Sequence, residues 1–593
     1  MTTSDSLRSE ILSGLTEYFS GRGVAAPEIA LDTPDHSEHG DITNSSALKY
    51  AKELGQSPVA IAQEGIRFLQ EKNIAGIAKI EFAAPGYINI FVDATYLRGV
   101  IGDIISAGDS YGRNERFSGQ KWVIEHTSPN PNKAMHLGHL RNNLIGMGIT
   151  RLLELSGAEV VCDCIDNNRG IAIAKLMWGF LEHQRKDGVG GHTVEQWHAH
   201  KNEWLTPEEA GELPDVFVTN SYVMGEKDFR NDPQIEAKVR QMVVDWENSD
   251  PLIRELWKHV LEYSYEGIQR TLKRLGNRWD KVWHEHEHYQ DGKDAIEAGL
   301  AKHIFVRLED GAVLTNLEAY NLPDTILLKK DGTSLYITQD IALTTMKKAL
   351  YKADRLVWVI GPEQALAMKQ LFAVCEQLGI GTLSNFTHVS YGYVGLKTDS
   401  GFKKMSSRDG TSVMIDDVLD SAKNNIRESR FGSLDPAEAE ELSEKLAVAA
   451  VKFSLLKIER TQDMAFDISQ ATEMQGDTGI YVMYTYVRLI SILEKAAAEG
   501  FKIEPAAIDC AAEVVKKMFL YNVAIAKSAE SFSLHHIAQF LLQLCAEFNS
   551  WYSKEKILDG SDSQSHKLAV VKALSQIIKN GLAILGIPVV KKM

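Results

Sequence analysis

Two histidines three residues apart, His136 and His139, stand in the stretch SPNPNKAMHLGHLRNN, residues 128–143. If His136 lies in the first turn of a helix, both imidazoles project from the same side of that helix. The free N–H groups and partial positive charge of a helix N-terminus favour phosphate binding. Gly138 leaves room for a flat ring against the backbone, and Lys133 adds a cation to the same phosphates. We therefore expect a nucleoside triphosphate to bind here.

A second segment with phosphate-binding chemistry is GFKKMSSRDG, residues 401–410. Lysine and hydroxyl side chains bracketed by glycines can form a loop that closes over a pyrophosphate and reopens. A solvent-exposed basic turn would have the same composition, so this stretch taken alone leaves both interpretations open. Its presence in the same chain as the histidine pair favours the phosphate-binding interpretation.

The histidine pair lies between two predicted strands. WVIEH predicts a buried strand, LGHLRNNLIGMGITRLLELSG predicts a helix, and EVVCDCI predicts a second strand. A strand–helix–strand unit of this kind builds a parallel sheet with helices on its faces. The loop before the helix then lies at the carboxyl edge of the sheet, where open α/β sheets bind ligands. We expect a Rossmann-like parallel-sheet catalytic domain.

Further parts precede and follow this domain. The first part predicts a small α+β unit, with helices at 5–19 and 58–70 before the strand pair KIEFAAPGYINIFVD. The polar, Trp-rich segment at about 182–293 is typical of an insertion. The expected domains are 1–115 (α+β), 116–395 (catalytic, with the insertion), 396–436 (basic loop and connecting segment) and 437–593 (all-α).

Later in the catalytic domain, DTILLKKDGTSLYIT and RLVWVIG predict strands, and TTMKKALYK between them predicts a helix. Nearly everything after Ala437 has helical periodicity, which predicts a bundle of amphipathic helices. Its helices are expected at 443–460, 478–498, 511–530, 534–552 and 566–586.

Composition excludes several classes of protein. A chain of 593 residues with 44% hydrophobic and 24% charged residues predicts three or four globular domains. It begins with no basic and apolar leader and contains no apolar run long enough to span a bilayer, so we expect a cytoplasmic protein that binds no membrane. Five scattered cysteines fit reduced thiols, and CDC has no second cysteine pair near it, so we expect no zinc site.

The formal net charge of −16 argues against a polyanionic partner for the chain as a whole. From Ser563 to Met593, however, five lysines stand without a single Asp or Glu. Such a basic end could hold nucleic acid, and it could equally be the solvated face of a lysine-rich helix.

The two motifs in this order resemble the paired HIGH and KMSKS signatures of class I aminoacyl-tRNA synthetases. The remaining text is similar to the arginyl-tRNA synthetase family over nearly the whole chain. PDHSEHGDITNSSALKYAK and APGYINIFV resemble the family's N-terminal domain, which touches the tRNA elbow. DNNRGIAIAKLMWG, SLYITQDIA and FNSWYSKEKIL resemble its catalytic and anticodon-binding domains. This resemblance implies ATP-dependent ligation of L-arginine to tRNA(Arg) through an arginyl-adenylate, releasing AMP and pyrophosphate.

The resemblance also implies which residues bind arginine. Tyr336 and Asp340 match the Tyr-x-x-x-Asp element that reads the guanidinium, whose planar donors need carboxylates and a hydroxyl. Glu285 in WDKVWHEHEHYQ is the best match to a further glutamate, with Glu287 as the alternative. Gln339 departs from the family, which commonly has Arg there. The residues implied for the α-amino group and its surroundings are Asn130, Gln364, Ser128 and Glu125.

For ATP, the resemblance assigns the triphosphate to His136, His139, Lys133 and Lys404, with Mg²⁺ on the leaving oxygens. Gly138 and Met405 would contact the nucleotide, and Ser406 and Ser407 would donate hydrogen bonds from the second motif.

For tRNA, Tyr481, Tyr484 and Met593 are expected to face the anticodon loop, although aromatic residues three apart are commonly core. The family is usually monomeric, and it generally needs bound tRNA before it activates arginine.

Three alternatives remain open at this point. One is another class I synthetase, glutamyl or cysteinyl, although Asp340 would repel a glutamate substrate. A second is a small nucleotidyltransferase that shares the first motif. The third is a synthetase-like protein that binds RNA without catalysis, against which His136, His139 and Lys404 count, since a binding protein would not need them. A metal site at the alternating His284, His286 and His288 is disfavoured because zinc sites usually have a fuller ligand set.

Overall fold

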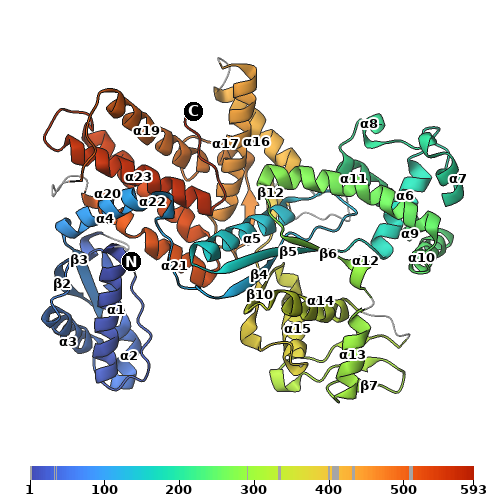
Figure 1. Ribbon diagram of the computed structural model, residues 1–593, viewed down its shortest axis with the longest axis horizontal. Helices are drawn as coiled ribbons and strands as arrows, with labels where there is room; N and C mark the ends of the chain where they lie inside the picture. The colour runs from blue at the N-terminus through green and yellow to red at the C-terminus, as the bar shows by residue number, and fades with distance from the viewer. Residues whose placement is uncertain are drawn as a thin grey trace. The chain divides into compact units, whose positions relative to one another are not determined.

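The chain forms two compact units, Met1–Asn114 with Glu473–Met593, and Glu115–Thr472 (Figure 1). The structure is a computed structural model. It describes residues 3–32, 34, 37–289, 291–330, 335–398, 401–403, 413–430, 434–505 and 512–593. Within these residues, no helix combines the length and apolar character needed to cross a bilayer.

The first unit begins with the expected α+β part. Its antiparallel sheet has the strand order β1-β3-β2, and the predicted strand pair forms β2 and β3. Ile88, Ile90 and Val92, which share one face of β3, are buried, and Asn89 on the other face is buried as well. The elements are α1 (Thr3–Gly21), β1 (Ile42–Asn44), α2 (Ser46–Leu54), α3 (Pro58–Glu71), β2 (Ile77–Ala83), β3 (Tyr87–Val92) and α4 (Ala94–Ala107).

The C-terminal helices complete this unit, and α23 packs on α4. The expected helix 511–530 is two helices, because Leu520 interrupts it. Two of the five terminal lysines are engaged: Lys567 pairs with Asp559 at 2.8 Å and Lys579 with Asp109 at 2.6 Å. The elements are α19 (Gly479–Ala498), α20 (Ala512–Phe519), α21 (Tyr521–Ser531), α22 (His535–Lys554) and α23 (Gln564–Ile584).

The second unit is built on a five-stranded, all-parallel sheet with the order β11-β10-β4-β5-β6. This confirms the predicted Rossmann-like parallel-sheet α/β fold. Helix α5 covers one face of the sheet, while α14 and α15 cover the other (Figure 1), where Val123, Ile341 and Leu371 share one core. The elements are β4 (Lys121–Glu125), α5 (Leu137–Leu155), β5 (Glu159–Asp166), β6 (Lys281–His284), α14 (Tyr336–Tyr351), β10 (Arg355–Val359), α15 (Ala365–Gln377) and β11 (Phe386–Val389).

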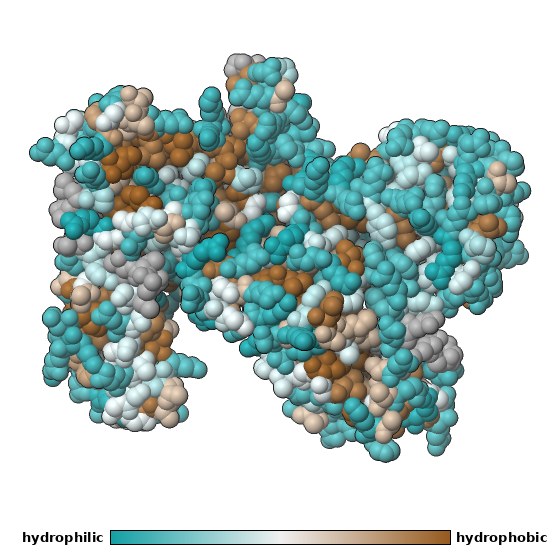
Figure 2. All heavy atoms as spheres, in the orientation of Figure 1, coloured by the Kyte–Doolittle hydropathy of each residue, from teal (hydrophilic) through white to brown (hydrophobic). Residues whose placement is uncertain are grey.

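The polar insertion is helical and has a core of its own, with Trp197, Phe217 and Trp246 among its buried residues. Proline at the first turn and a capping residue before it begin several of these helices, as at Asp232-Pro233. Hydrophilic side chains cover most of its visible face (Figure 2). The helices are α6 (Ile171–His183), α7 (Val194–Ala199), α8 (Pro207–Ala210), α9 (Pro214–Asn231), α10 (Pro233–Glu247) and α11 (Pro251–Leu275).

One strand prediction is wrong. Among its described residues, DTILLKKDGTSLYIT forms the short strand β9 (Ile326–Leu328), and from Tyr336 onward the chain is helical as α14. The apolar residues after Tyr336 serve the helix, since Ile341, Ala342 and Leu343 pack toward the sheet core. Helices α12 (Glu285–His288) and α13 (Asp291–Ala301) and strands β7 (Val306–Arg307) and β8 (Val313–Leu314) precede it.

After the five-stranded sheet, strand β12 packs against α5, and the chain then forms the two long helices α16 and α17. The helix α17, which the sequence predicted in the C-terminal bundle, packs with α16 and α5 of the second unit. The elements are β12 (Val394–Thr398), β13 (Gly401–Lys403), α16 (Ile415–Arg430), α17 (Pro436–Leu456), β14 (Met464–Phe466) and α18 (Ile468–Ala471).

Candidate functional site

The sheet of the second unit has a switch point between β4 and β10. The chain continues from β4 to β5 on one side, and it reaches β10 on the other side only after β6. Open parallel sheets bind ligands at such a point, outside the carboxyl ends of the strands. Glu125 ends β4 and Val359 ends β10 at this edge. Because α14 runs antiparallel to the strands, its N-terminal turn reaches the same edge.

The histidine pair begins α5. His136 is the N-cap residue; its Nδ1 accepts a hydrogen bond from the Gly138 amide at 3.1 Å. The Nδ1 of His139 accepts one from the His136 amide at 3.1 Å, and the rings stack with centroids 3.9 Å apart. Burial, together with the nearby charge of Lys133, lowers the pKa of His136 to about 4. Burial also places the pKa of His139 well below its usual value.

Both imidazoles are therefore neutral at physiological pH. With each Nδ1 accepting a backbone N–H, the proton resides on Nε2, which makes each ring a hydrogen-bond donor at that atom. Gly138 suits this position, because a Cβ there would lie 3.0 Å from Cε1 of His136 and would press on that ring. Half-buried Lys133 supplies the positive charge beside the rings.

Most of the second motif falls outside the described residues. Lys404, Met405, Ser406 and Ser407 lie outside the described residues, but both flanks of the motif are described. The segment that follows it pairs with the histidine segment: the Leu137 amide donates to the Val413 carbonyl at 3.3 Å, and the Ile415 amide donates to the Met135 carbonyl at 3.0 Å. The segment just after the second motif thus lies beside the N-terminus of α5.

The expected guanidinium-binding residues lie at the start of α14. Tyr336 and Asp340 are its first and fifth residues, one turn apart on one face; Tyr336 is 82% exposed. Burial and the neighbouring Glu125 raise the pKa of Asp340 to about 7, against the opposing charge of Lys347. A guanidinium placed beside Asp340 would favour its ionised form.

Glu285 joins this turn from the end of β6. Its Oε1 accepts a hydrogen bond from Nε2 of Gln339 at 3.1 Å and lies 3.5 Å from a guanidinium nitrogen of Arg169. Gln339, the departure from the family pattern, therefore still connects α14 to the glutamate. Glu287 is exposed. Of the two candidates, Glu285 is the one in contact with α14.

Glu125 is already paired. Its Oε2 accepts a hydrogen bond from Nζ of Lys347 at 2.7 Å, and the same ammonium lies 3.0 Å from Oδ1 of Asp163. Lys347 is 1% exposed. Burial lowers the pKa of Lys347, but Asp163 and Glu125 outweigh that effect and raise it above its usual value. The buried lysine thus fixes α14 to strands β4 and β5, a role that the sequence did not suggest.

The three remaining candidates differ in their surroundings. The Ser128 hydroxyl accepts a hydrogen bond from the Ile165 amide at 3.0 Å, which ties the loop after β4 to β5. Asn130 is exposed, with its Oδ1 3.4 Å from Nδ2 of Asn167. Gln364 is exposed just after β10. Asn130 and Gln364 flank the switch point, whereas Ser128 has a structural partner.

Polar residues buried in α5 are a part of the site that the sequence did not reveal. Thr127 has a left-handed φ of +57°, which is strained for a β-branched residue. Its amide donates to Oδ1 of Asn142 at 2.7 Å, and its hydroxyl accepts from Nδ2 of Asn143 at 3.2 Å. Asn142 also donates to the Val359 carbonyl at 2.7 Å, so it links β4 to β10. The run RNN inside an otherwise apolar helix was the available signal.

Two of the alternating histidines, His284 and His286, have separate hydrogen-bond partners. Nδ1 of His284 lies 2.7 Å from Oδ2 of Asp166, and Nδ1 of His286 lies 2.9 Å from Nδ2 of Asn168. His288 is buried. Across the described residues, His, Cys, Asp and Glu side chains form no group of three or more that could hold a metal ion.

In the first unit, the aromatic residues proposed for tRNA belong to one polar network on α19 and α22. Asn549 donates to the Tyr481 hydroxyl at 2.9 Å and accepts from Arg488 at 2.8 Å. Arg488 donates to the Tyr484 hydroxyl at 3.0 Å and lies 5.3 Å from the ring centre of Tyr552. Tyr484 and Tyr552 are partly exposed, so their rings are accessible rather than core.

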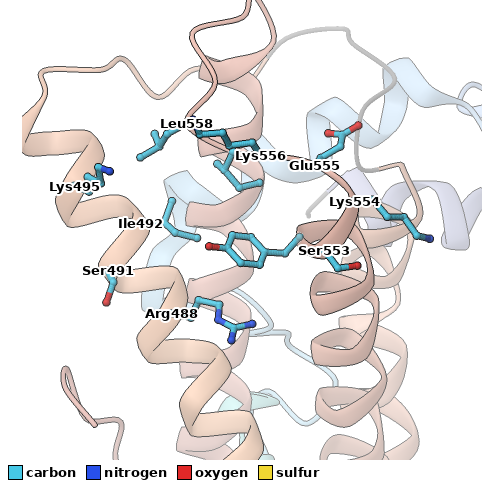
Figure 3. A pocket seen from close by; sticks show the side chains of 11 residues that line it. Arg488, Ser491, Ile492, Lys495, Ser553, Lys554, Glu555, Lys556 and Leu558 are labelled. Atoms are coloured by element: carbon cyan, nitrogen blue, oxygen red, sulfur yellow. The ribbon is translucent and has the colours of Figure 1, made fainter.

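Next to this network is a pocket of about 600 Å³. Figure 3 shows Arg488 and Ile492 of α19 pointing toward it, whereas Lys554 points away. The C-terminal tail lies beside the same helix, because the Val590 amide donates to Sδ of Met483 at 3.4 Å; Met593 follows three residues later and is half-exposed. Cations and exposed rings side by side suit single-stranded nucleic acid.

Comparison with known proteins agrees with these features. The chain matches the families described as tRNA synthetases class I (R), catalytic domain, at residues 101–185 and 194–468, arginyl tRNA synthetase N terminal domain at 5–92, and DALR anticodon binding domain at 482–593. It is 31% identical to the arginine–tRNA ligase of Treponema denticola, covering 100% of this chain and 99% of that protein. It is 30% identical to that of Bacteroides fragilis (strain YCH46), covering 100% of both chains.

Solved structures show the same fold. The arginyl-tRNA synthetase of Thermus thermophilus superposes with a TM-score of 0.77 at 22% identity, covering 98% of this chain and 99% of that one. That of Plasmodium falciparum gives a TM-score of 0.77 at 17% identity over 100% of both chains. Together with the sequence matches, this similarity places the chain in the arginyl-tRNA synthetase family of class I aminoacyl-tRNA synthetases.

Proposed function

We propose that this protein ligates L-arginine to tRNA(Arg) at the expense of ATP, through an arginyl-adenylate. The feature that carries the proposal is that donor-bearing imidazoles begin α5, an acidic turn begins α14, and both helices begin at the carboxyl edge of one sheet. The imidazoles suit phosphate oxygens, and the acidic turn suits a guanidinium. A single adenylate carries both groups.

The first step needs no nucleophile from the enzyme. The arginine carboxylate attacks the α-phosphorus of ATP in line, a new C–O–P linkage forms, and pyrophosphate leaves with the bonding electron pair. His136 and His139 would donate Nε2–H hydrogen bonds to phosphate oxygens, and Lys133 would add positive charge. Lys404, Ser406 and Ser407 are assigned to the same phosphates from sequence alone. Catalysis then consists of positioning and charge stabilisation.

The arginine side chain would bind at the start of α14. Asp340 and Glu285 would accept hydrogen bonds from its guanidinium N–H groups, and the Tyr336 hydroxyl would accept a further one. Asn130 and Gln364 would hold the α-amino group. In the second step, the 2′-hydroxyl of the terminal adenosine of tRNA attacks the arginyl carbonyl and AMP leaves. Tyr481, Tyr484 and Met593 would contact the anticodon loop of that tRNA.

Mg²⁺ would enter with ATP as part of that substrate. The described side chains beside His136 are an imidazole and an ammonium, which are poor ligands for this ion. Phosphate oxygens would therefore hold it, and when bound it neutralises their charge.

Pyrophosphate exchange tests the proposal. The purified protein is incubated with ATP and labelled pyrophosphate, with each of the twenty amino acids in turn, with and without total tRNA. We expect exchange with arginine alone among the amino acids, and only when tRNA is present. Exchange with another amino acid, or none with arginine and tRNA together, would refute the assignment.

A further inference from the structure

The helical insertion contacts the nucleotide-binding segment directly. The amide of Ala134, two residues before His136, donates to the Thr219 hydroxyl of α9 at 2.7 Å. That hydroxyl donates its own proton to the Asp215 carbonyl at 2.6 Å, so its oxygen can act only as an acceptor toward the Ala134 amide. Ala134 is 6% exposed, and its amide has little access to water as an alternative partner.

A second connection runs through Asp416, in the first turn of α16. This carboxylate lies 3.0 Å from Arg270 and 2.5 Å from Arg274, two α11 residues one turn apart. Burial would raise the pKa of Asp416, but hydrogen bonds from Thr271, Arg270 and Arg274 outweigh it and lower the pKa. Asp416 is therefore ionised and fixed to the insertion.

Both connections converge on the same short segment. Arg270 also lies 3.0 Å from Asp215, so the insertion helices α9 and α11 are tied to each other at this place. A Cβ on Gly267 would lie 2.4 Å from Cβ of Asp215, which shows how closely α9 and α11 approach. The residues immediately before Asp416 pair with residues 135–137, and His136 forms a β-bridge with Met414.

We propose that Thr219 and Asp416 are positioning residues for ATP binding, through which the helical insertion holds His136 in place. Thr219 fixes the amide two residues before His136, and Asp416 fixes the strand that pairs with His136. Neither side chain belongs to the arginine-binding turn of α14. The inference rests on the proposed function and concerns the ATP half of the site.

Thr219→Val tests the first connection, because valine keeps the shape and removes the acceptor of the Ala134 amide. We expect kcat/KM for ATP in arginine- and tRNA-dependent pyrophosphate exchange to fall about tenfold, the usual scale for an unpaired buried amide. The KM for arginine should stay within about twofold. Thr219→Ser keeps the acceptor and should restore most of the loss.

Ser221→Ala is the matched control. Ser221 lies on the same helix, and its hydroxyl donates to Phe217 and accepts from Gln184 without reaching residue 134. Its loss should leave the kinetics for ATP unchanged at a temperature where all variants are folded by circular dichroism. Equal losses in Thr219→Val and Ser221→Ala, or no loss in Thr219→Val, would overturn the inference.

Asp416→Asn tests the second connection, with Glu440→Gln as its control. Glu440 pairs with Lys423 and Arg427 farther along α16. We expect Asp416→Asn alone to lower kcat/KM for ATP, without a matching change for arginine; equal effects on both substrates would contradict the proposal. Wild-type exchange is measured first, since its absence would refute the proposed function and not this inference.

Discussion

The charge state of single residues decides what the site can bind. His136 and His139 are held neutral, so they offer hydrogen bonds to phosphate without the desolvation cost of two further cations. Asp340 titrates near neutral pH, which leaves it ready to ionise when a cation arrives. The two halves of the site therefore depend on pH in different ways.

Asp340→Asn should raise the KM for arginine about tenfold or more. A charge-assisted hydrogen bond contributes roughly 1.5–3 kcal/mol, and the amide keeps the shape but loses the charge. The measurement is pyrophosphate exchange at varied arginine concentration. Asp354→Asn is the control, since its carboxylate binds the Lys121 amide at the opposite edge of the sheet. An unchanged KM in Asp340→Asn would remove Asp340 from the pocket.

The affinity for arginine should rise with pH. The pKa of Asp340 is raised to about 7, and only the ionised form pairs with a guanidinium, so kcat/KM for arginine should increase through pH 7 and then level off. Because folding raises this pKa, ionisation of Asp340 opposes folding of the free protein as pH rises toward 7. Asp340→Asn should abolish the rise; a rise that persists in this variant would assign the titration to another group.

Lys347→Met should destabilise the protein by about 3–5 kcal/mol, because it leaves the buried carboxylates of Glu125 and Asp163 without their cation. Urea unfolding monitored by circular dichroism measures the change. Lys445→Ala, which removes a lysine from the exposed pair with Glu441, should leave the unfolding free energy nearly unchanged. A small effect of Lys347→Met would mean that the two carboxylates take up protons at little cost.

At the scale of elements, the first two turns of α5 carry both the histidine pair and the buried amides that pack against the sheet. Its first turn presents His136 and His139, and its second presents the buried amides that hold Thr127 and join β4 to β10. The same helix therefore carries the proposed phosphate-binding residues and also shapes the loop that leads to them.

Gly138→Ala should lower kcat/KM for ATP about tenfold while changing Tm little. Alanine suits a helix, but its Cβ would displace the His136 ring, whose Cε1 lies 3.0 Å away. Pyrophosphate exchange at varied ATP concentration and a thermal melt give the two values. Gly102→Ala is the control, because nothing lies within 4 Å of a Cβ there. A large loss of Tm in Gly138→Ala alone would point to a folding defect.

At the scale of the whole molecule, the chemistry and the proposed anticodon contacts belong to different compact units. Each unit has its own core, and the first is assembled from both ends of the chain. We therefore expect substitutions at the proposed tRNA contacts to leave the proposed arginine pocket unchanged.

Arg488→Ala should raise the KM for tRNA at least about fivefold in aminoacylation and leave the maximal rate unchanged at saturating tRNA. Arg488 contacts Tyr484, Asn549 and Tyr552, so its loss removes a cation and loosens two exposed rings. Lys445→Ala, in the other unit, is the matched loss of one positive charge. A fall in maximal rate that saturating tRNA does not correct would argue that Arg488 acts elsewhere.

The sequence by itself determined the local elements and the chemistry they carry. Apolar periodicity predicted β4, α5 and β5, and the histidine spacing predicted a phosphate site at the start of α5, because these signals lie within one or two turns of chain. It misjudged Tyr336, where β-branched and aromatic residues favour a strand and packing against the sheet made a helix.

The tertiary structure alone decided which distant groups meet. Lys347 pairs with Glu125 and Asp163, Thr219 with Ala134, and Asp416 with Arg274. These partners are too far apart in the sequence for any local pattern to predict the contact. It also placed α17 with the sheet rather than with the C-terminal bundle. Burial favours such pairings, since an amide left unpaired in the interior costs about 1–3 kcal/mol and an unpaired charge costs more.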